Sequence, residues 1–312
     1  MKLTLRCLVT AVAAGAIAAP ALAQDGGLAR KAMLGVAIEG AAGGAKIVSV
    51  AAGATAAAAG LQPDDVIVSM NGAPVSDHTA LVAMADQLRA GQQVSLIYTR
   101  GGQSATALAT ATARPMESYN NAKALYGAVP FRGGQLRDIL VTPQSAPKDG
   151  AVVYLIQGYY CGSMEGPNAA HPYRSLAQGL ADRGIATYRV EKPGMGDSMG
   201  GPACQDTDFD TELAAFREGL KTLIEKHGVA PGRIVILGHS MGGVQAPLLA
   251  AEAEGLRGVA IYGAVMRNWH DYMQDLFRLQ SFFSVGADPS EGEQLAEAKL
   301  HGMDVLKGHR MT

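Results

Sequence analysis

The segment that most restricts the fold of this chain is Gly238-His239-Ser240-Met241-Gly242. An apolar run, 233–237, comes directly before it, and a helical pattern, 244–254, follows it. Gly-x-Ser-x-Gly alone is a weak signal in a glycine-rich chain, but this context is specific. A serine at a sharp turn from strand to helix requires glycine on both sides, because Cβ atoms there would collide with the neighbouring strand and helix. The sequence therefore predicts a strand, a tight turn and a helix.

The predicted turn also gives Ser240 the surroundings of an activated nucleophile. The N-terminus of a helix points free backbone amides at the negative charge that develops when a serine attacks a carbonyl group. The alternative is a turn that binds a nucleotide phosphate. That alternative is disfavoured because the segment has neither a G-x-G-x-x-G pattern nor the lysine of a P-loop.

From Tyr126 onwards, apolar runs alternate with helical patterns. A continuous apolar run is typical of a parallel strand buried on both faces. The intervening helices are long enough to cross between parallel strands, which predicts a doubly wound, mostly parallel α/β sheet. The strand patterns are 152–156, 185–190, 233–237 and 258–263, and the helical patterns are 173–183, 211–227 and 244–254.

These residues resemble the α/β-hydrolase family. The resemblance implies that Ser240 is the nucleophile and that the backbone N–H of Met241 is one oxyanion donor. The other donor would come from the turn Gln157-Gly158-Tyr159-Tyr160, with Tyr159 as first choice and Tyr160 as second. Glutamine stands here where many members have histidine, which leaves the backbone donor intact.

The resemblance also implies a base and an acid after the nucleophile, in the chain order Ser, then Asp or Glu, then His. The 72 residues after Ser240 hold one strand pattern and then helical patterns that resemble a lid beginning near residue 264. The strands that would carry the acid and the histidine are not visible, so we expect the domain, 126–312, to be incomplete at its C-terminus. We expect the three later histidines, His270, His301 and His309, to lie on the surface or in the lid and not to act as the base. Asp271 is a weak candidate for the acid.

A second pattern, of short strands and glycine-rich turns, covers residues 28–113. Asn71-Gly72 predicts a tight turn, because both residues tolerate positive φ. Expected strands are 34–38, 45–50, 65–72 and 93–99, with a helix at 77–89. This small, strand-rich pattern resembles a PDZ domain of the bacterial periplasmic type on three segments: Met33-Leu34-Gly35-Val36, 58–67 and Met70-Asn71-Gly72.

The PDZ resemblance implies a place for a peptide. The amides of Leu34, Gly35 and Val36 would receive a terminal carboxylate, and the peptide would add to the sheet as a strand. The alternative is a domain that only packs against its neighbour. Asp64 stands where such domains usually carry glycine, and the alanine-rich stretch 51–59 is expected to form a short turn and helix.

The two domains are expected to divide at Arg114-Pro115, with a linker over residues 114–125. At the other end of the chain, Lys2 and Arg6 precede an apolar run that ends in Ala21-Leu22-Ala23. This pattern predicts a cleaved signal peptide over residues 1–23, and the run is shorter than the roughly 20 apolar residues of a membrane span. We therefore expect an exported protein, periplasmic or secreted.

Composition excludes several functions. The 26 Lys and Arg against 28 Asp and Glu leave a net charge of −2, which disfavours nucleic acid as a partner. No CxxC or Cys/His cluster has metal-ligand spacing, so no metal and no cofactor are expected. Signal cleavage would leave Cys161 and Cys204, which the hydrolase resemblance places at one rim of the pocket, and a disulfide between them is expected. A catalytic or redox-active Cys161 is the weaker reading, since it lacks a helix N-terminus.

We therefore expect an exported serine hydrolase that cleaves an ester bond, with an amide as second option, through an acyl-enzyme on Ser240. Its partners would be a small-molecule ester or peptide substrate and, at the PDZ-like domain, a protein C-terminus. The alternative is a catalytically inactive scaffold that binds peptides through residues 34–36.

Overall fold

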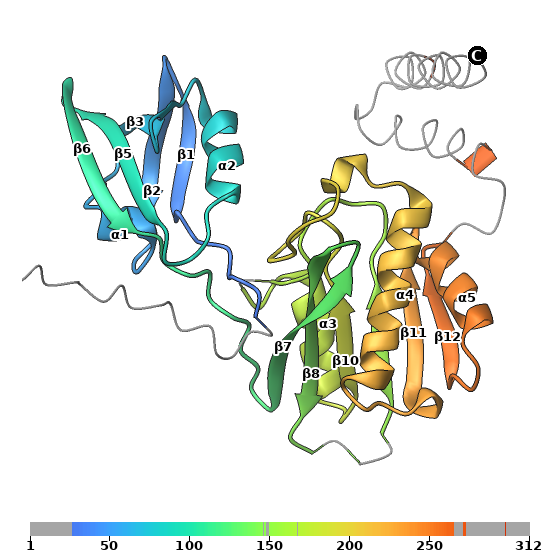
Figure 1. Ribbon diagram of the computed structural model, residues 1–312. Helices are drawn as coiled ribbons and strands as arrows, with labels where there is room; N and C mark the ends of the chain where they lie inside the picture. Colours follow the sequence, from blue (N-terminus) through green and yellow to red (C-terminus); the bar gives the residue numbers. More distant parts are fainter. Residues whose placement is uncertain are drawn as a thin grey trace, which may run out of the picture. The chain divides into compact units, whose positions relative to one another are not determined.

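The structure of the 312-residue chain is a computed structural model. It describes residues 27–145, 147, 150–166, 168–264, 271, 272 and 297. The chain divides between Arg114 and Pro115 into two compact units (Figure 1). The expected signal peptide, 1–23, lies outside the described residues, as does nearly all of the expected lid after residue 264.

The first unit is an antiparallel sheet with two short helices. Its strand order is β1-β2-β3-β5-β6, and β4 pairs with β3. The strands β4 and β6 are additions to the predicted set, and α1 lies in the alanine-rich stretch that was expected to contain a short helix. The elements are β1 (Val36–Ala41), β2 (Gly44–Val50), α1 (Thr55–Ala58), β3 (Val66–Met70), β4 (Ala73–Pro74), α2 (His78–Asp86), β5 (Gln93–Arg100) and β6 (Gln103–Thr110).

The turns of this unit show why particular residues stand in them. Asn71 and Gly72 have φ values of 51° and 81°, which confirms the predicted tight turn between β3 and β4. Asp64 has a φ of 71°, in the left-handed region that favours glycine and that aspartate tolerates better than most residues. Its carboxylate lies 3.1 Å from the ammonium of Lys46. Aspartate can therefore replace the usual glycine in this turn.

The second unit is a six-stranded, mostly parallel sheet in the order β12-β11-β9-β10-β8-β7. The first four of these strands are parallel, and β8 and β7 are antiparallel to their neighbours. The elements are β7 (Ala122–Phe131), β8 (Gly134–Pro143), β9 (Val152–Ile156), α3 (Pro172–Ala181), β10 (Ala186–Val190), η1 (Cys204–Asp206), α4 (Phe209–Glu225), η2 (Pro231–Arg233), β11 (Ile234–His239), α5 (Gly242–Glu252) and β12 (Gly258–Tyr262).

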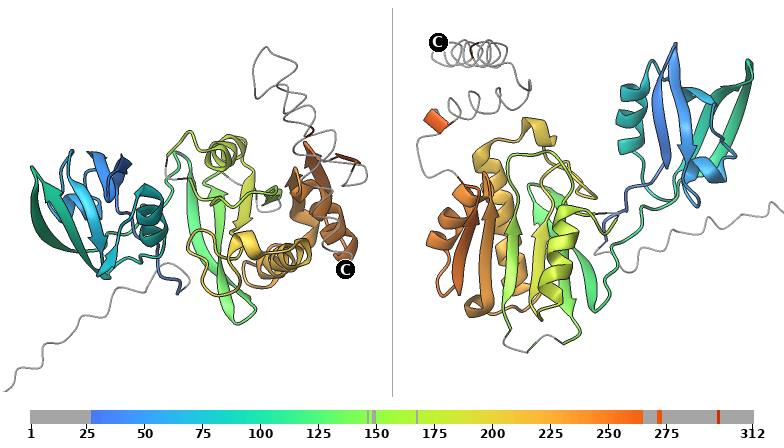
Figure 2. Two further views of the ribbon diagram at one scale, coloured as in Figure 1. Left: turned by 90° about the horizontal axis from the view of Figure 1, so that it is seen from above. Right: turned by 180° about the vertical axis from the view of Figure 1, so that it is seen from behind.

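The helices cover both faces of this sheet. Figure 2 shows α3 on one face and α4 and α5 on the other. The strands β9 and β10 are buried along their whole length, as expected for parallel strands covered on both sides. The predicted doubly wound α/β fold is confirmed. None of the helices in the described ranges has the length and apolar character of a membrane span.

The hairpin of β7 and β8 is a feature that the sequence patterns did not predict. Its turn is made by Arg132 and Gly133, with φ values of 45° and 78°. The strand β7 begins at Ala122, and the side chain of Glu117 is buried in the second unit. Much of the expected linker, 114–125, is therefore part of this unit.

In the first unit, Asp65 should account for part of the stability. Its side chain is 1% exposed, and its two oxygens accept hydrogen bonds of 2.7 Å from Arg100 and one of 2.8 Å from the amide of Gln62. The bond from Arg100 holds the pKa of Asp65 below its usual range. This stabilisation is present above about pH 4 and is lost as pH falls through the lower, folded-state pKa. Asp65→Asn should cost about 1–3 kcal/mol at pH 7.

Hydrogen exchange of the β3 and β5 amides in the full chain measures this effect at pH 7 and pH 3. At pH 7, Asp65→Asn should lower the hydrogen-exchange protection of these amides. On going from pH 7 to pH 3, its protection should fall by less than that of the wild-type protein. The control is Asp64→Asn, whose side chain is 84% exposed and should matter by less than about 0.5 kcal/mol. Equal effects of the two variants would contradict the prediction.

Candidate functional site

Ser240 lies at the sharp turn between β11 and α5. Its φ of 55° is in the left-handed region, which is strained for a residue with a side chain. The turn is fixed on both sides: the Ser240 amide donates to the carbonyl of Tyr262 at 3.0 Å, and the Ser240 carbonyl accepts from the amide of Gly243 at 2.9 Å. The neighbouring strand β12 and the first turn of α5 therefore hold the serine in place.

The glycines on either side of Ser240 are required by packing. A Cβ atom at Gly238 would lie 2.1 Å from the carbonyl oxygen of Gly242. A Cβ atom at Gly242 would lie 2.4 Å from the carbonyl oxygen of Ile156 at the end of β9. Both distances are far inside van der Waals contact. The steric requirement predicted for the Gly-x-Ser-x-Gly segment is confirmed.

The turn after β9 passes directly beside the serine. A Cβ atom at Gly158 would lie 2.7 Å from the Cβ of Ser240 and 3.2 Å from its Oγ, so only glycine fits there. The rings of Tyr159 and Tyr160 are exposed, at 78% and 69%. Gln157 is fully buried, and its side-chain amide has no hydrogen-bond partner within the described ranges.

Two backbone amides at this site are available as donors. Those of Tyr159 and Met241 make no hydrogen bond among the residues that the structure describes. One belongs to the turn beside Ser240, and the other lies at the N-terminal end of α5. The positive end of the helix dipole makes the Met241 amide a stronger hydrogen-bond donor. Two N–H groups without a hydrogen bond among the described residues therefore lie on the two elements that adjoin Ser240.

A buried ion pair supports the turn at Gly158. The ammonium of Lys192 lies 2.8 Å from the Gly158 carbonyl oxygen and 2.7 Å from a carboxylate oxygen of Glu212 in the first turn of α4. The side chains are 1% and 7% exposed. Burial lowers the pKa of Lys192, and Glu212 opposes that shift. The sequence patterns singled out neither residue, because nothing local to either one indicates its partner.

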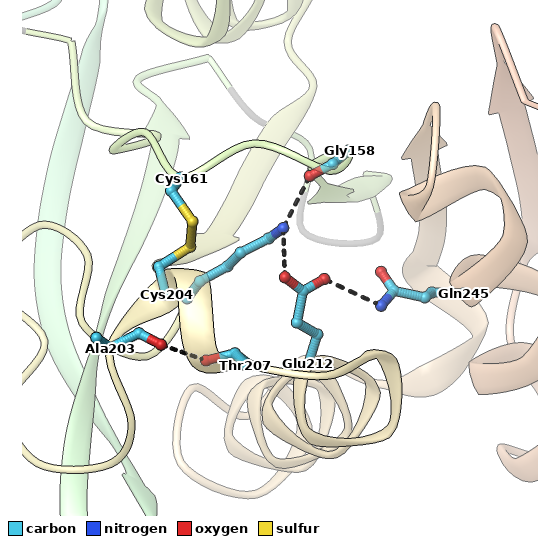
Figure 3. The surroundings of a disulfide bond; sticks show 8 residues. Gly158, Cys161, Ala203, Cys204, Thr207, Glu212 and Gln245 are labelled. Atoms are coloured by element: carbon cyan, nitrogen blue, oxygen red, sulfur yellow. Dashed lines mark hydrogen bonds and ion pairs between the residues drawn. A yellow bond between two sulfur atoms is a disulfide. The ribbon is translucent and has the colours of Figure 1, made fainter. Parts of the chain in front are cut away.

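The predicted disulfide joins Cys161 and Cys204 (Figure 3). Cys161 is exposed and lies three residues after Gly158, and Cys204 is buried at the start of η1. The bond therefore ties the far end of the turn to the segment that leads into α4. Neither sulfur is a free thiol in this structure, so a catalytic Cys161 has no support from it.

Two further buried carboxylates hold the segment 163–166. Glu191 accepts hydrogen bonds of 3.0 Å from the amides of Met164 and Glu165, and burial raises its pKa. Glu117 accepts one of 2.7 Å from the amide of Gly166. Burial alone would raise the pKa of Glu117, but its ion pair with Arg189 lowers it overall. The chain beyond the disulfide is thus fixed through its backbone.

No described side chain hydrogen-bonds to the hydroxyl of Ser240. The ring of His239 stacks on Tyr262, with 5.6 Å between ring centroids. Asp271 is exposed. The three later histidines, His270, His301 and His309, lie outside the described residues, so the base and the acid stay predictions. Among the residues described, no cluster of three or more His, Cys, Asp or Glu could hold a metal ion.

A second candidate site lies at the start of β1 in the first unit. Gly35 has a φ of 74°, and a Cβ atom there would lie 2.1 Å from the Cβ of Ala54. The amides of Leu34 and Gly35 make no hydrogen bond within the described part of the chain. They precede Val36, the first residue of β1, which is an edge strand of its sheet. Free amides next to a free edge are what a terminal carboxylate and an added strand require.

Removing the disulfide should lower the stability of the second unit. It closes a loop of 43 residues, which corresponds to about 3–4 kcal/mol in the chain-entropy account. A Cys161→Ser/Cys204→Ser variant should therefore unfold at a lower temperature than the oxidised protein. Calorimetry with and without a reductant measures this. The reductant should shift the parent protein and leave the variant unchanged; an equal shift in both would contradict the prediction.

Two family profiles match the chain. Residues 32–110 match the PDZ domain, and residues 167–288 match the family described as serine aminopeptidase, S33. No curated protein sequence matches the chain.

Several solved structures resemble parts of it. An HtrA-type protease, AlgW, with a bound decapeptide is 25% identical over 28% of this chain and 31% of its own, with a TM-score of 0.27. A proline iminopeptidase from Mycobacterium smegmatis is 24% identical over 50% of this chain and 49% of its own, with a TM-score of 0.38. An esterase from Pyrococcus furiosus is 18% identical over 60% of this chain and 66% of its own, with a TM-score of 0.40. The chain spans less than two thirds of the length of each.

The two profiles agree with the architecture of the two units. The PDZ match covers the antiparallel sheet, and the second match includes β10, β11, β12 and the turn at Ser240. Residues 32–110 therefore match a PDZ domain, and residues 167–288 match a hydrolase family profile in a unit with an α/β-hydrolase type of fold.

Proposed function

We propose that this chain is an exported serine hydrolase that cleaves an ester bond through an acyl-enzyme on Ser240. The observation that carries the proposal is the position of Ser240, which has a left-handed φ of 55° and lies next to two unused backbone donors, the amides of Tyr159 and Met241. Such donors stabilise an oxyanion, and losing one costs about 10²–10³ in kcat in enzymes of this kind.

In the proposed reaction, the Oγ of Ser240 bonds to the carbonyl carbon of the substrate. One electron pair of the C=O bond moves to the oxygen, which accepts hydrogen bonds from the two amides, and the hydroxyl proton passes to a base. The C=O bond then re-forms and the C–O bond to the alcohol breaks, and the alcohol takes the proton from the base. Water, deprotonated by the same base, attacks the resulting acyl-enzyme and releases the acid and the serine. The family resemblance predicts a histidine as the base, oriented by a carboxylate.

We propose an ester as substrate before an amide. An amine leaves only when a well-placed acid protonates it, whereas the alkoxide of an activated ester departs more readily. Export is proposed on two grounds: the pattern of a signal peptide in residues 1–23, and a disulfide of the kind that persists in oxidising compartments.

A fluorophosphonate probe tests the nucleophile directly. The full-length protein should become covalently labelled, and mass spectrometry of its peptides should place the label on Ser240. Ser240→Ala should abolish labelling and the hydrolysis of p-nitrophenyl esters, by at least about 10³-fold. Ser175→Ala, a change at an exposed serine in α3, should leave both unchanged. A folded wild-type protein that takes up no label at Ser240 would overturn the proposal.

We also propose that the PDZ domain binds a peptide by its C-terminal carboxylate, because the amides of Leu34 and Gly35 are unused next to the free edge of β1. The full chain should bind peptides with a free C-terminus at least about tenfold more tightly than their C-terminally amidated forms. Calorimetric titration of both forms measures the difference. Equal affinity would contradict a carboxylate site and leave the domain as a packing module.

A further inference from the structure

We propose that Lys192 is a positioning residue that fixes the direction of an oxyanion donor from inside the domain. The inference rests on the proposed function, because the donor in question is the backbone amide of Tyr159. Lys192 itself does not touch the substrate in this account. It acts through one peptide group, the one that joins Gly158 to Tyr159.

The geometry of that peptide group carries the first step. The carbonyl of Gly158 and the N–H of Tyr159 belong to the same planar, trans unit, so the two bonds point in opposite directions. The ammonium of Lys192 binds the carbonyl oxygen at 2.8 Å and holds it towards the interior. The N–H of Tyr159 is thereby turned away from the lysine, in a turn where a Cβ atom at Gly158 would lie 3.2 Å from the Oγ of Ser240.

No other hydrogen bond among the described residues acts on this peptide group. The disulfide holds Cys161, and Glu191 and Glu117 hold the amides of residues 164–166. Among the hydrogen bonds of the described residues, Lys192 alone reaches the carbonyl of Gly158. If that bond is lost, the peptide group can rotate while the rest of the loop stays in place.

The second step is electrostatic. Lys192 is buried, and Glu212, 2.7 Å away, stabilises its charged form. A positive charge on the carbonyl side of a peptide group polarises it and makes its N–H a stronger donor, and a low local dielectric strengthens this effect. Lys192 therefore both aims the Tyr159 amide and increases its partial positive charge.

The contacts of Glu212 connect the turn to the nucleophile's own helix. Its second carboxylate oxygen lies 3.4 Å from the side-chain nitrogen of Gln245 on α5 (Figure 3). The helix α5 begins two residues after Ser240. The oxyanion turn, α4 and α5 are thus joined through one buried polar group, so the donor and the nucleophile are held in a common frame.

Stability alone does not account for this ion pair. Two charges lose their hydration on burial, and replacing such a pair by apolar or neutral side chains of similar volume is often neutral or stabilising. A methionine has nearly the length of lysine and could fill the same space. The two roles, packing and positioning, therefore predict different behaviour when both charges are removed together.

The experiment compares Lys192→Met with the double variant Lys192→Met/Glu212→Gln in the full-length protein. Lys192→Met leaves Glu212 unpaired and should lower both the unfolding temperature and the activity. The double variant should recover the unfolding temperature. Its kcat for p-nitrophenyl esters and its rate of fluorophosphonate labelling should stay about 10- to 100-fold below wild type, with KM changed less than about threefold.

Residual dipolar couplings of backbone N–H groups, which report their direction, give a readout that does not depend on turnover. The coupling of the Tyr159 N–H should change between wild type and the double variant, while those of Met164 and Glu165, held by Glu191, should stay the same. The matched control is Lys226→Met. Lys226 also donates to a backbone carbonyl, that of Ala128 at 3.2 Å, but it lies at the other end of α4, about 21 Å from Glu212 along the helix axis. Lys226→Met should leave the rate of fluorophosphonate labelling and kcat unchanged.

The outcomes separate the two proposals. A double variant with wild-type labelling rate and a wild-type N–H coupling at Tyr159 would overturn the positioning role and leave only an ion pair. A wild-type protein without label at Ser240 would overturn the proposed function, and this inference with it. Slow labelling in a stable double variant, together with a changed N–H coupling at Tyr159, is the result expected.

Discussion

The site depends on a main-chain contact between the end of β9 and the turn that follows β11. The turn at Ser240 packs so closely on the end of β9 that a single Cβ atom at Gly242 would lie 2.4 Å from the Ile156 carbonyl oxygen, and one at Gly158 would lie 2.7 Å from the serine. No side chain can come between these two segments. Their spacing is therefore set by backbone geometry, and the remaining features of the second unit hold the two segments at that spacing.

The holding groups are buried charged residues: Glu191 and Lys192 directly follow β10, and Glu117 lies before β7. Loops cannot use sheet hydrogen bonds, so their backbone groups need other partners. Lys192 supplies one for Gly158, and Glu191 and Glu117 supply three for residues 164–166. Buried charges are unfavourable on their own, but here each is paired or multiply hydrogen-bonded. The result is a loop ordered before any ligand binds, which is the condition for effective electrostatic stabilisation.

Sequence alone predicted those parts of the structure that depend on neighbouring residues. Apolar runs and helical spacing gave β9 to β12 and α3 to α5, and the glycines around Ser240 predicted the sharp turn. The hairpin of β7 and β8 was missed, although Arg132 and Gly133 mark a two-residue turn between β-like runs. The role of Lys192 could not be predicted, because its two partners are Gly158 in the turn after β9 and Glu212 on α4. Only the fold brings these residues together.

The disulfide connects the proposed export to the rigidity of the site. Lys192 holds the start of the loop at Gly158, whereas its exposed end at Cys161 is tied by the bond to Cys204. A disulfide with one exposed cysteine persists best where the surroundings are oxidising. In a reducing compartment the loop would retain its buried anchors and lose its outer one. The turn that we propose as an oxyanion donor would therefore be best ordered in an oxidising compartment, which is where the proposed signal peptide would deliver the chain.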